Sequence, residues 1–146
     1  MTKGMLISFT DIDKTYEEEL RSWFVNEHID ERAIHTNGFF RSRLYEAINN
    51  GPKFFASYET ESFSTLCSES YMHTVSNQTE WSKKIIPKLT LLERYTGKIT
   101  IDSMRGFGGK IAVYRFLPHE NEKLRNELRN VIKNKVQKIT QSDWVN

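Results

Sequence analysis

The stretch that decides the fold is FFRSRLYEAINNGPKFFASYE, residues 39–59. Two runs that contain phenylalanine and tyrosine, residues 39–47 and 53–59, flank the sequence Asn-Asn-Gly-Pro. These four residues favour a tight turn, because asparagine and glycine tolerate left-handed backbone conformations and proline fixes its own φ. The stretch therefore predicts two antiparallel strands joined as a hairpin.

Strand and helix patterns extend from this hairpin in both directions. Residues 5–10 carry apolar side chains on both faces, as in a strand buried on two sides. A Thr-x-x-Glu capping box at 15–18 predicts the start of a helix, and Gly38 ends that pattern. After the hairpin, residues 62–87 predict a broken helical segment and residues 90–102 a fourth strand. The order β-α-β-β-α-β is the split βαβ arrangement of ferredoxin-like α+β domains.

The same pattern begins again near the C-terminus and stops before it is complete. A glycine-rich linker, residues 103–109, precedes an apolar run at 111–116 that predicts a strand, and a long helix is expected after it. We therefore expect a ferredoxin-like unit over 1–102 and an incomplete second repeat, a strand plus a helix, over 110–146. One apolar sheet face of the first unit then needs a partner, so we expect a homodimer.

Composition restricts the partners and the compartment. The net charge is only +2, and acidic and basic residues are interleaved, so no nucleic-acid partner is expected. No stretch approaches the roughly 20 apolar residues that cross a bilayer, so no membrane partner is expected either. The single cysteine, Cys67, cannot form an internal disulfide, which fits a cytoplasmic protein.

Residues around the first helix and the second strand resemble a known family. The residues that carry the resemblance are Trp23, Glu27, His28, Glu31, Arg32, Gly38, Phe39, Arg43 and Tyr45. They are similar to the Trp-x-x-x-Glu-His-x-x-Glu-Arg … Gly-Phe … Arg-x-Tyr stretch of EthD-like members of the dimeric α+β barrel superfamily. The resemblance implies a four-stranded sheet with its helices on one face. It also implies that the other face closes against a second copy, or a second repeat, around a ligand cavity.

His28 and Glu27 are the candidate catalytic residues. The superfamily resemblance implies a histidine near this helix that acts as acid or base, which suits an imidazole because it titrates near neutrality. On an α-helix drawn at ~100° per residue, Glu27 falls inside the apolar arc, whereas His28 falls at its edge, ~80° from Leu20. A buried carboxylate is costly unless it finds a partner. Glu27 is therefore either a general base or half of a structural ion pair, and His28 either a catalyst or a brace at the helix end.

Five further residues are candidates for binding a ligand. They are Arg41, Arg43, Tyr45, Tyr58 and Trp81. The first three share one parity of a strand and would suit an acidic or phenolic small molecule if that side faces the cavity. On the outer side they would be an ordinary solvated face, and the two other aromatic residues could equally belong to the core.

Metal and cofactor sites have little support in the sequence. The spacing of His28, Glu31 and His35 would suit a metal only on a helix that continues to residue 35, and no cysteine cluster accompanies it. We expect neither a metal nor a cofactor.

The sequence therefore predicts an α+β barrel protein that binds a small organic ligand. The first interpretation is a cofactor-free isomerase, cyclase or dehydratase that uses His28 as its acid or base. The second is a noncatalytic ligand-binding or assembly module. The third is a haem- or oxygen-linked barrel of the monooxygenase type, a class that the superfamily resemblance also includes.

Overall fold

The computed structural model describes residues 2–104 and 108–140. The chain divides into two compact units, Met1–Ile99 and Thr100–Asn146, and each is described by itself. No helix in the described part of the chain is both long and apolar enough to span a bilayer.

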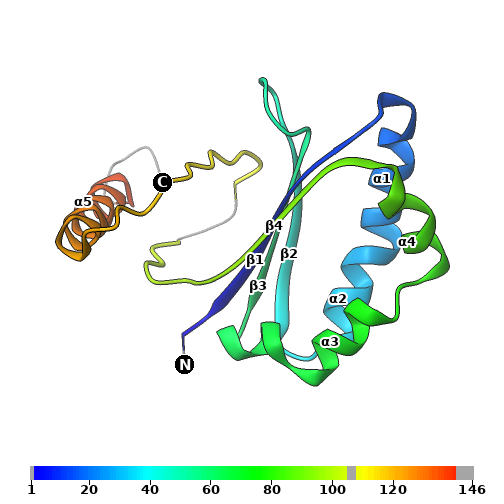
Figure 1. Cartoon of the computed structure of the whole chain (residues 1–146), viewed down its shortest axis with the longest axis horizontal. Coiled ribbons are helices and arrows are strands. Elements are labelled where there is room, and N and C mark those ends of the chain that lie inside the picture. The colour runs from blue at the N-terminus through cyan, green and yellow to red at the C-terminus, as the bar shows by residue number, and fades with distance from the viewer. Residues whose placement is uncertain (1, 105–107, 141–146) are drawn as a thin grey trace. The chain divides into compact units, whose positions relative to one another are not determined.

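The first unit is built on a four-stranded sheet (Figure 1). Its strands are β1 (Gly4–Ile12), β2 (Phe39–Glu46), β3 (Phe54–Thr60) and β4 (Leu89–Lys98). The strand order is β2-β3-β1-β4, and every neighbouring pair is antiparallel. This confirms both the hairpin predicted from residues 39–59 and the ferredoxin-like α+β topology.

The helices of the first unit all cover one face of the sheet, as Figure 1 shows. They are α1 (Glu17–Trp23), α2 (Ile29–His35), α3 (Glu69–Ser76) and α4 (Glu80–Ile85). One turn of π-helix, Phe24–His28, joins α1 to α2 without a break. Short 3₁₀ turns occupy Lys14–Tyr16, Phe63–Cys67 and Ile86–Lys88. The helical segment expected over residues 62–87 is thus present and broken, as its irregular pattern predicted.

Local hydrogen bonds explain where these helices begin. Ser68 Oγ accepts from the backbone N–H of Tyr71 at the start of α3, and Thr79 Oγ1 accepts from the N–H of Ser82 at the start of α4. Both are N-caps, which satisfy backbone donors that the helix itself leaves free. The capping box predicted at 15–18 does not form. Instead, Asp13 Oδ1 accepts from the Thr15 N–H at 2.9 Å, and α1 begins at Glu17.

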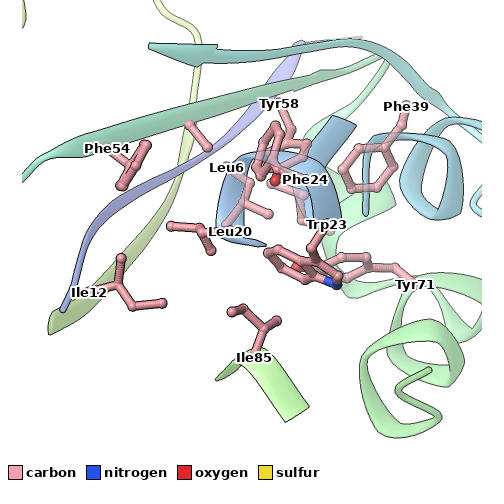
Figure 2. Packing of buried hydrophobic residues seen from close by; sticks show 12 residues of the cluster. Leu6, Ile12, Leu20, Trp23, Phe24, Phe39, Phe54, Tyr58, Tyr71 and Ile85 are labelled. Atoms are coloured by element: carbon pink, nitrogen blue, oxygen red, sulfur yellow. The ribbon is translucent and has the colours of Figure 1, made fainter. Parts of the chain in front are cut away.

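The core lies between the sheet and the helices (Figure 2). Its buried residues are Leu6, Ile12, Leu20, Trp23, Phe24, Phe39, Phe54, Ala56, Tyr58, Leu66, Tyr71 and Ile85. Alternate strand residues point to opposite sides of a sheet, so the register divides the strand residues into two sets. Leu6, Ser8 and Thr10 of β1 lie beside Tyr58, Ala56 and Phe54 of β3 on the helix-covered face. Ile7 and Phe9 lie on the opposite face.

A charged cluster ties α1 to the edge strand β2. The Arg21 guanidinium donates to Oε1 of Glu46 at 2.5 Å and to Oε2 of the same carboxylate at 2.9 Å, and it also donates to Glu17 at 3.0 Å. The hydrogen bond from Arg21 holds the pKa of Glu46 below its ordinary value. The side chains of Arg21 and Glu46 are about one-third exposed, so water screens much of this attraction.

The second unit contains one described helix, α5 (Glu122–Thr140), which confirms the helix expected there. Residues 111–116 were expected to form a strand, but they carry no helix or strand in the structure. A strand is held by ladder hydrogen bonds to a neighbour, and the described part of the second unit contains no other strand with which it could pair. Residues 105–107 of the expected linker lie outside the described residues. The interpretation of residues 110–146 as an incomplete repeat stays a prediction.

Candidate functional site

A cavity of about 150 Å³ lies within the first unit, between the sheet and its helices. Side chains from all four strands and from α1, α2, α3 and α4 line it, and the strand residues belong to the helix-covered face. Most of the lining is apolar. The ionisable or strongly polar lining residues include His28, Glu31, Gln78 and Arg94. A concave apolar site with a few convergent polar groups is the usual form of a small-molecule site.

The π-turn between α1 and α2 places His28 in this cavity. It is defined by a hydrogen bond from the backbone N–H of Ile29 to the carbonyl of Phe24, five residues earlier. In a regular α-helix, Trp23 and His28 would point about 140° apart, because they are five residues apart at ~100° per residue. In the structure their rings are stacked, with centroids 4.2 Å apart and planes inclined by 28°. Single π-turns of this kind are frequent at functional sites.

Aromatic rings pack around His28, and one carboxylate lies near it. Besides the stack on Trp23, its ring centroid lies 5.5 Å from that of Phe24 and 6.0 Å, edge to face, from that of Tyr58. Nδ1 of His28 lies 3.5 Å from Oε2 of Glu31, and the two side chains are only 14% and 11% exposed. The carboxylate thus stands where it would stabilise a proton on the imidazole.

Glu27, the second catalytic candidate, lies outside the residues that line this cavity. Its Oε1 accepts a 2.5 Å hydrogen bond from Oγ1 of Thr79, the residue that caps α4. Oγ1 of Thr79 also lies 2.9 Å from Oγ of Ser82, which in turn accepts from Nε1 of Trp23 at 3.1 Å. Glu27 therefore belongs to a group of polar contacts that links α4 to the π-turn and to α1.

Arg41, Arg43 and Tyr45 lie together on one side of β2, as predicted from their parity, but on the opposite face of the sheet from His28. Arg41 donates to Oε1 of Glu59 at 2.6 Å, and the ring of Tyr45 lies 6.2 Å from that of Phe55. The two arginines and His28 were expected to act on one ligand. The sheet separates them, because the cavity described above lies on the helix-covered face. The cavity that the resemblance implies on the other face stays a prediction.

The two remaining ligand-binding candidates differ from each other. Tyr58 is 3% exposed and lines the cavity. Trp81 is half-buried and packs against the core without lining the cavity. Sequence reasoning gave Glu31 no role apart from the metal alternative and missed Arg94 altogether. The signal for Arg94 was its place in the fourth strand at the same parity as Leu92, but strand parity alone does not say which face is hollow.

No group of three or more His, Cys, Asp or Glu side chains is placed to hold a metal ion within residues 2–104 and 108–140. His28 and Glu31 approach each other, but His35, the third residue of the metal alternative, is exposed. Cys67 is exposed as well.

No protein-family model and no curated protein matches this sequence. Solved structures do match the fold. A dimeric ferredoxin-like protein from an uncultured marine organism is 14% identical with a TM-score of 0.56, and the match covers 73% of this chain and 95% of the other. The haem degrader MhuD from Mycobacterium tuberculosis, solved with two haems in its active site, is 13% identical with a TM-score of 0.50, over 69% and 99% of the two chains.

A protein of the ethyl tert-butyl ether d (EthD) family from Bacillus halodurans also matches, at 8% identity and a TM-score of 0.49, over 68% and 100% of the two chains. At such identities a likeness is one of fold. The strand order β2-β3-β1-β4 and the matches to the marine protein and to MhuD agree on the fold. This chain has a ferredoxin-like α+β fold.

Proposed function

We propose that this protein binds a small organic molecule in the cavity beside His28 and catalyses a cofactor-free proton transfer on it. The observation that carries the proposal is an imidazole, only 14% exposed and 3.5 Å from a carboxylate, that lines a mostly apolar cavity. A cavity of about 150 Å³ accommodates one six-membered ring. The reaction class would be an isomerisation or a related cyclisation or dehydration.

The residues have distinct roles in this proposal. His28 takes a proton from a carbon next to a carbonyl group and returns it to the same or a neighbouring atom. Glu31 is a positioning residue, because its carboxylate faces Nδ1 and stabilises the imidazolium that forms during transfer. Trp23 and Phe24 keep the ring in place and exclude water from it.

Deuterium exchange of cyclohexanone in D2O tests this proposal. The ketone has one ring, and its α-hydrogens exchange when a base removes them, which proton NMR follows directly. We expect the protein to accelerate the exchange. His28→Gln should lower the protein-catalysed rate by about 100-fold or more, the usual contribution of a general base.

His73→Gln is the matched control, because His73 is exposed on α3 and does not line the cavity. This variant should retain the full rate. Trp23 lines the cavity, so tryptophan fluorescence reports ligand binding separately from exchange. Binding of cyclohexanone without exchange would contradict catalysis and support the noncatalytic ligand-binding alternative. Failure to bind would contradict the ligand site itself.

Haem-linked chemistry is the second candidate, because MhuD, which shares the fold, holds haem in its active site. The cavity weighs against it. Sites for drug-sized molecules occupy roughly 300–1,000 Å³, whereas this cavity measures about 150 Å³. A porphyrin would therefore require the helices to move away from the sheet. The absorbance spectrum of the protein mixed with hemin separates the two candidates.

We also propose that the opposite face of the sheet closes against a second copy of the chain. Aromatic rings gather there: Phe9 lies 5.1 Å from Phe55 and 6.4 Å from Tyr95 between ring centroids, and Tyr95 is 47% exposed. Burial of such a patch favours association. Sedimentation at micromolar concentration should give the mass of a dimer, and a stable monomer would contradict this proposal. The cytoplasmic location expected from the lone cysteine stays a prediction.

A further inference from the structure

We infer that the ligand of this cavity is a carboxylate built on a single ring, and that Arg94 binds its carboxylate group. The inference rests on the proposed ligand site, but it does not require proton transfer by His28. It assigns a second polar contact to the cavity and a charge to the ligand.

Arg94 supplies the positive charge of the site. It lies in β4 opposite Ser8 of β1, on the helix-covered face. Among the described lining residues it is the only lysine or arginine. Arg94 is also exposed, so it lies where the cavity meets solvent. An anionic ligand that enters the cavity would meet this guanidinium first.

The contacts of Arg94 leave its charge without a counter-ion among the described residues. Its Nη2 donates to the hydroxyl of Tyr71 at 2.7 Å, and a phenol is neutral near pH 7. None of the ion pairs within 4.0 Å among the described residues involves this guanidinium. Two other arginines, in contrast, have carboxylate partners: Arg21 donates to three carboxylates, and Arg41 donates to Glu59.

A guanidinium has five N–H donors in a rigid fork, and a carboxylate accepts two of them side by side. Tyr71 engages one nitrogen only, so donors remain for a ligand. Tyr71 is itself fixed, because it is 4% exposed and packs on Phe39 with ring centroids 5.4 Å apart. The phenol therefore holds the arginine at the cavity, which lowers the entropy cost of binding an anion there.

The rest of the cavity sets the size and total charge of the ligand. Its aromatic walls include Trp23, Phe24 and Phe54, which suit a flat ring, and its volume admits one ring. Glu31 lines the same cavity, so a second carboxylate placed beside it would be repelled. The site thus favours a monoanion whose ring lies toward His28 and whose carboxylate lies at Arg94.

Benzoate and benzamide test the inference, because they share one ring and differ in charge. Binding to the full chain is measured by tryptophan fluorescence at low ionic strength. We expect the Kd for benzoate to be at least about tenfold lower than that for benzamide, as a charge-assisted hydrogen bond predicts. Arg94→Gln should bring the two Kd values within about twofold of each other, through weaker binding of benzoate alone.

Two further variants separate direct contact from general charge. Lys98→Gln removes one positive charge from the same strand at a residue that does not line the cavity, and it should keep the preference for benzoate. Tyr71→Phe removes the hydroxyl that positions Arg94, and it should weaken benzoate binding by less than Arg94→Gln does while benzamide binding stays unchanged. Arg94→Lys should keep only part of the preference for benzoate, because an ammonium lacks the planar fork of a guanidinium.

The outcomes distinguish this inference from the proposed function. Equal binding of benzoate and benzamide by the wild type would overturn the inference and leave the cavity as a ligand site. Retention of the preference in Arg94→Gln, or its loss in Lys98→Gln, would also overturn it. If neither compound binds, and cyclohexanone does not bind either, the inference and the proposed function both fail. A His28→Gln variant that keeps the preference for benzoate supports the assignment to Arg94.

Discussion

Replacing Phe54 by alanine is expected to lower the free energy of unfolding by about 3–5 kcal/mol, the usual cost of removing a buried phenylalanine. Phe54 is 1% exposed, lies in β3 and lines the cavity. Its ring also faces the Arg21 guanidinium, 5.5 Å from the ring centroid. The space left by the ring would merge with the existing cavity, so the surrounding side chains could not close it. Urea unfolding followed by circular dichroism measures the loss.

Phe40→Ala is the matched control for Phe54→Ala. Phe40 belongs to the neighbouring strand β2 and is 43% exposed, with Lys3 and Arg41 over its ring. Its replacement should cost under about 1 kcal/mol, because surface substitutions change stability little. A loss at Phe54 as small as that at Phe40 would contradict the placement of the core between sheet and helices.

Trp23→Ala should also destabilise the fold by about 3–5 kcal/mol, and it should weaken ligand binding as well. Trp23 is 5% exposed, stacks on His28 and donates from Nε1 to Oγ of Ser82. The substitution therefore removes a core ring, a hydrogen bond and the surface that orients the imidazole. Urea unfolding gives the first effect, and binding of benzoate measured by NMR gives the second.

Trp23→Phe divides these contributions. It keeps an aromatic ring beside His28 and loses the N–H bond to Ser82, so we expect a loss of about 1–2 kcal/mol and a site that still binds. A loss below about 1 kcal/mol for Trp23→Ala would show that the stacked pair contributes little to the fold. Equal losses for Trp23→Ala and Trp23→Phe would assign the whole effect to the hydrogen bond.

The topology could be predicted from the sequence because each strand and helix has a local sequence signal. The Asn-Asn-Gly-Pro turn specifies the hairpin of β2 and β3, and the strands and helices follow one another in the order that defines the fold. Residues 111–116 show where this method fails. Their apolar pattern suits a strand, but a strand also needs a partner for its hydrogen bonds, and local sequence does not supply that information.

The site could be predicted only in part, because one residue shifts the helical register. Measured from Leu20 at ~100° per residue, an unbroken α-helix places Glu27 at ~340° and His28 at ~80°. If the π-turn absorbs one residue, Glu27 moves to ~240° and His28 to ~340°. His28 therefore takes the position expected for Glu27 and lines the cavity, whereas Glu27 leaves the apolar arc and bonds Thr79 outside the cavity. The sequence around residues 24–28 contains no glycine or proline that would signal this change.

The faces of the sheet show a second limit. Sequence parity correctly groups Arg41, Arg43 and Tyr45 on one side of β2. Which side the helices cover depends on the packing of segments far apart in the chain, and parity does not determine it. For the same reason strand parity did not single out Arg94, which lines the cavity and donates a hydrogen bond to Tyr71 of α3.

The π-turn also affects how this protein should be compared with others. A helix that is α-helical throughout reaches the same position with one residue fewer, so an alignment needs a single gap between residues 24 and 28. Without that gap, every residue from His28 to the end of α2 would be matched to a neighbour on the wrong side of the other helix. A relative that carries the same cavity histidine could then be mistaken for one that lacks it.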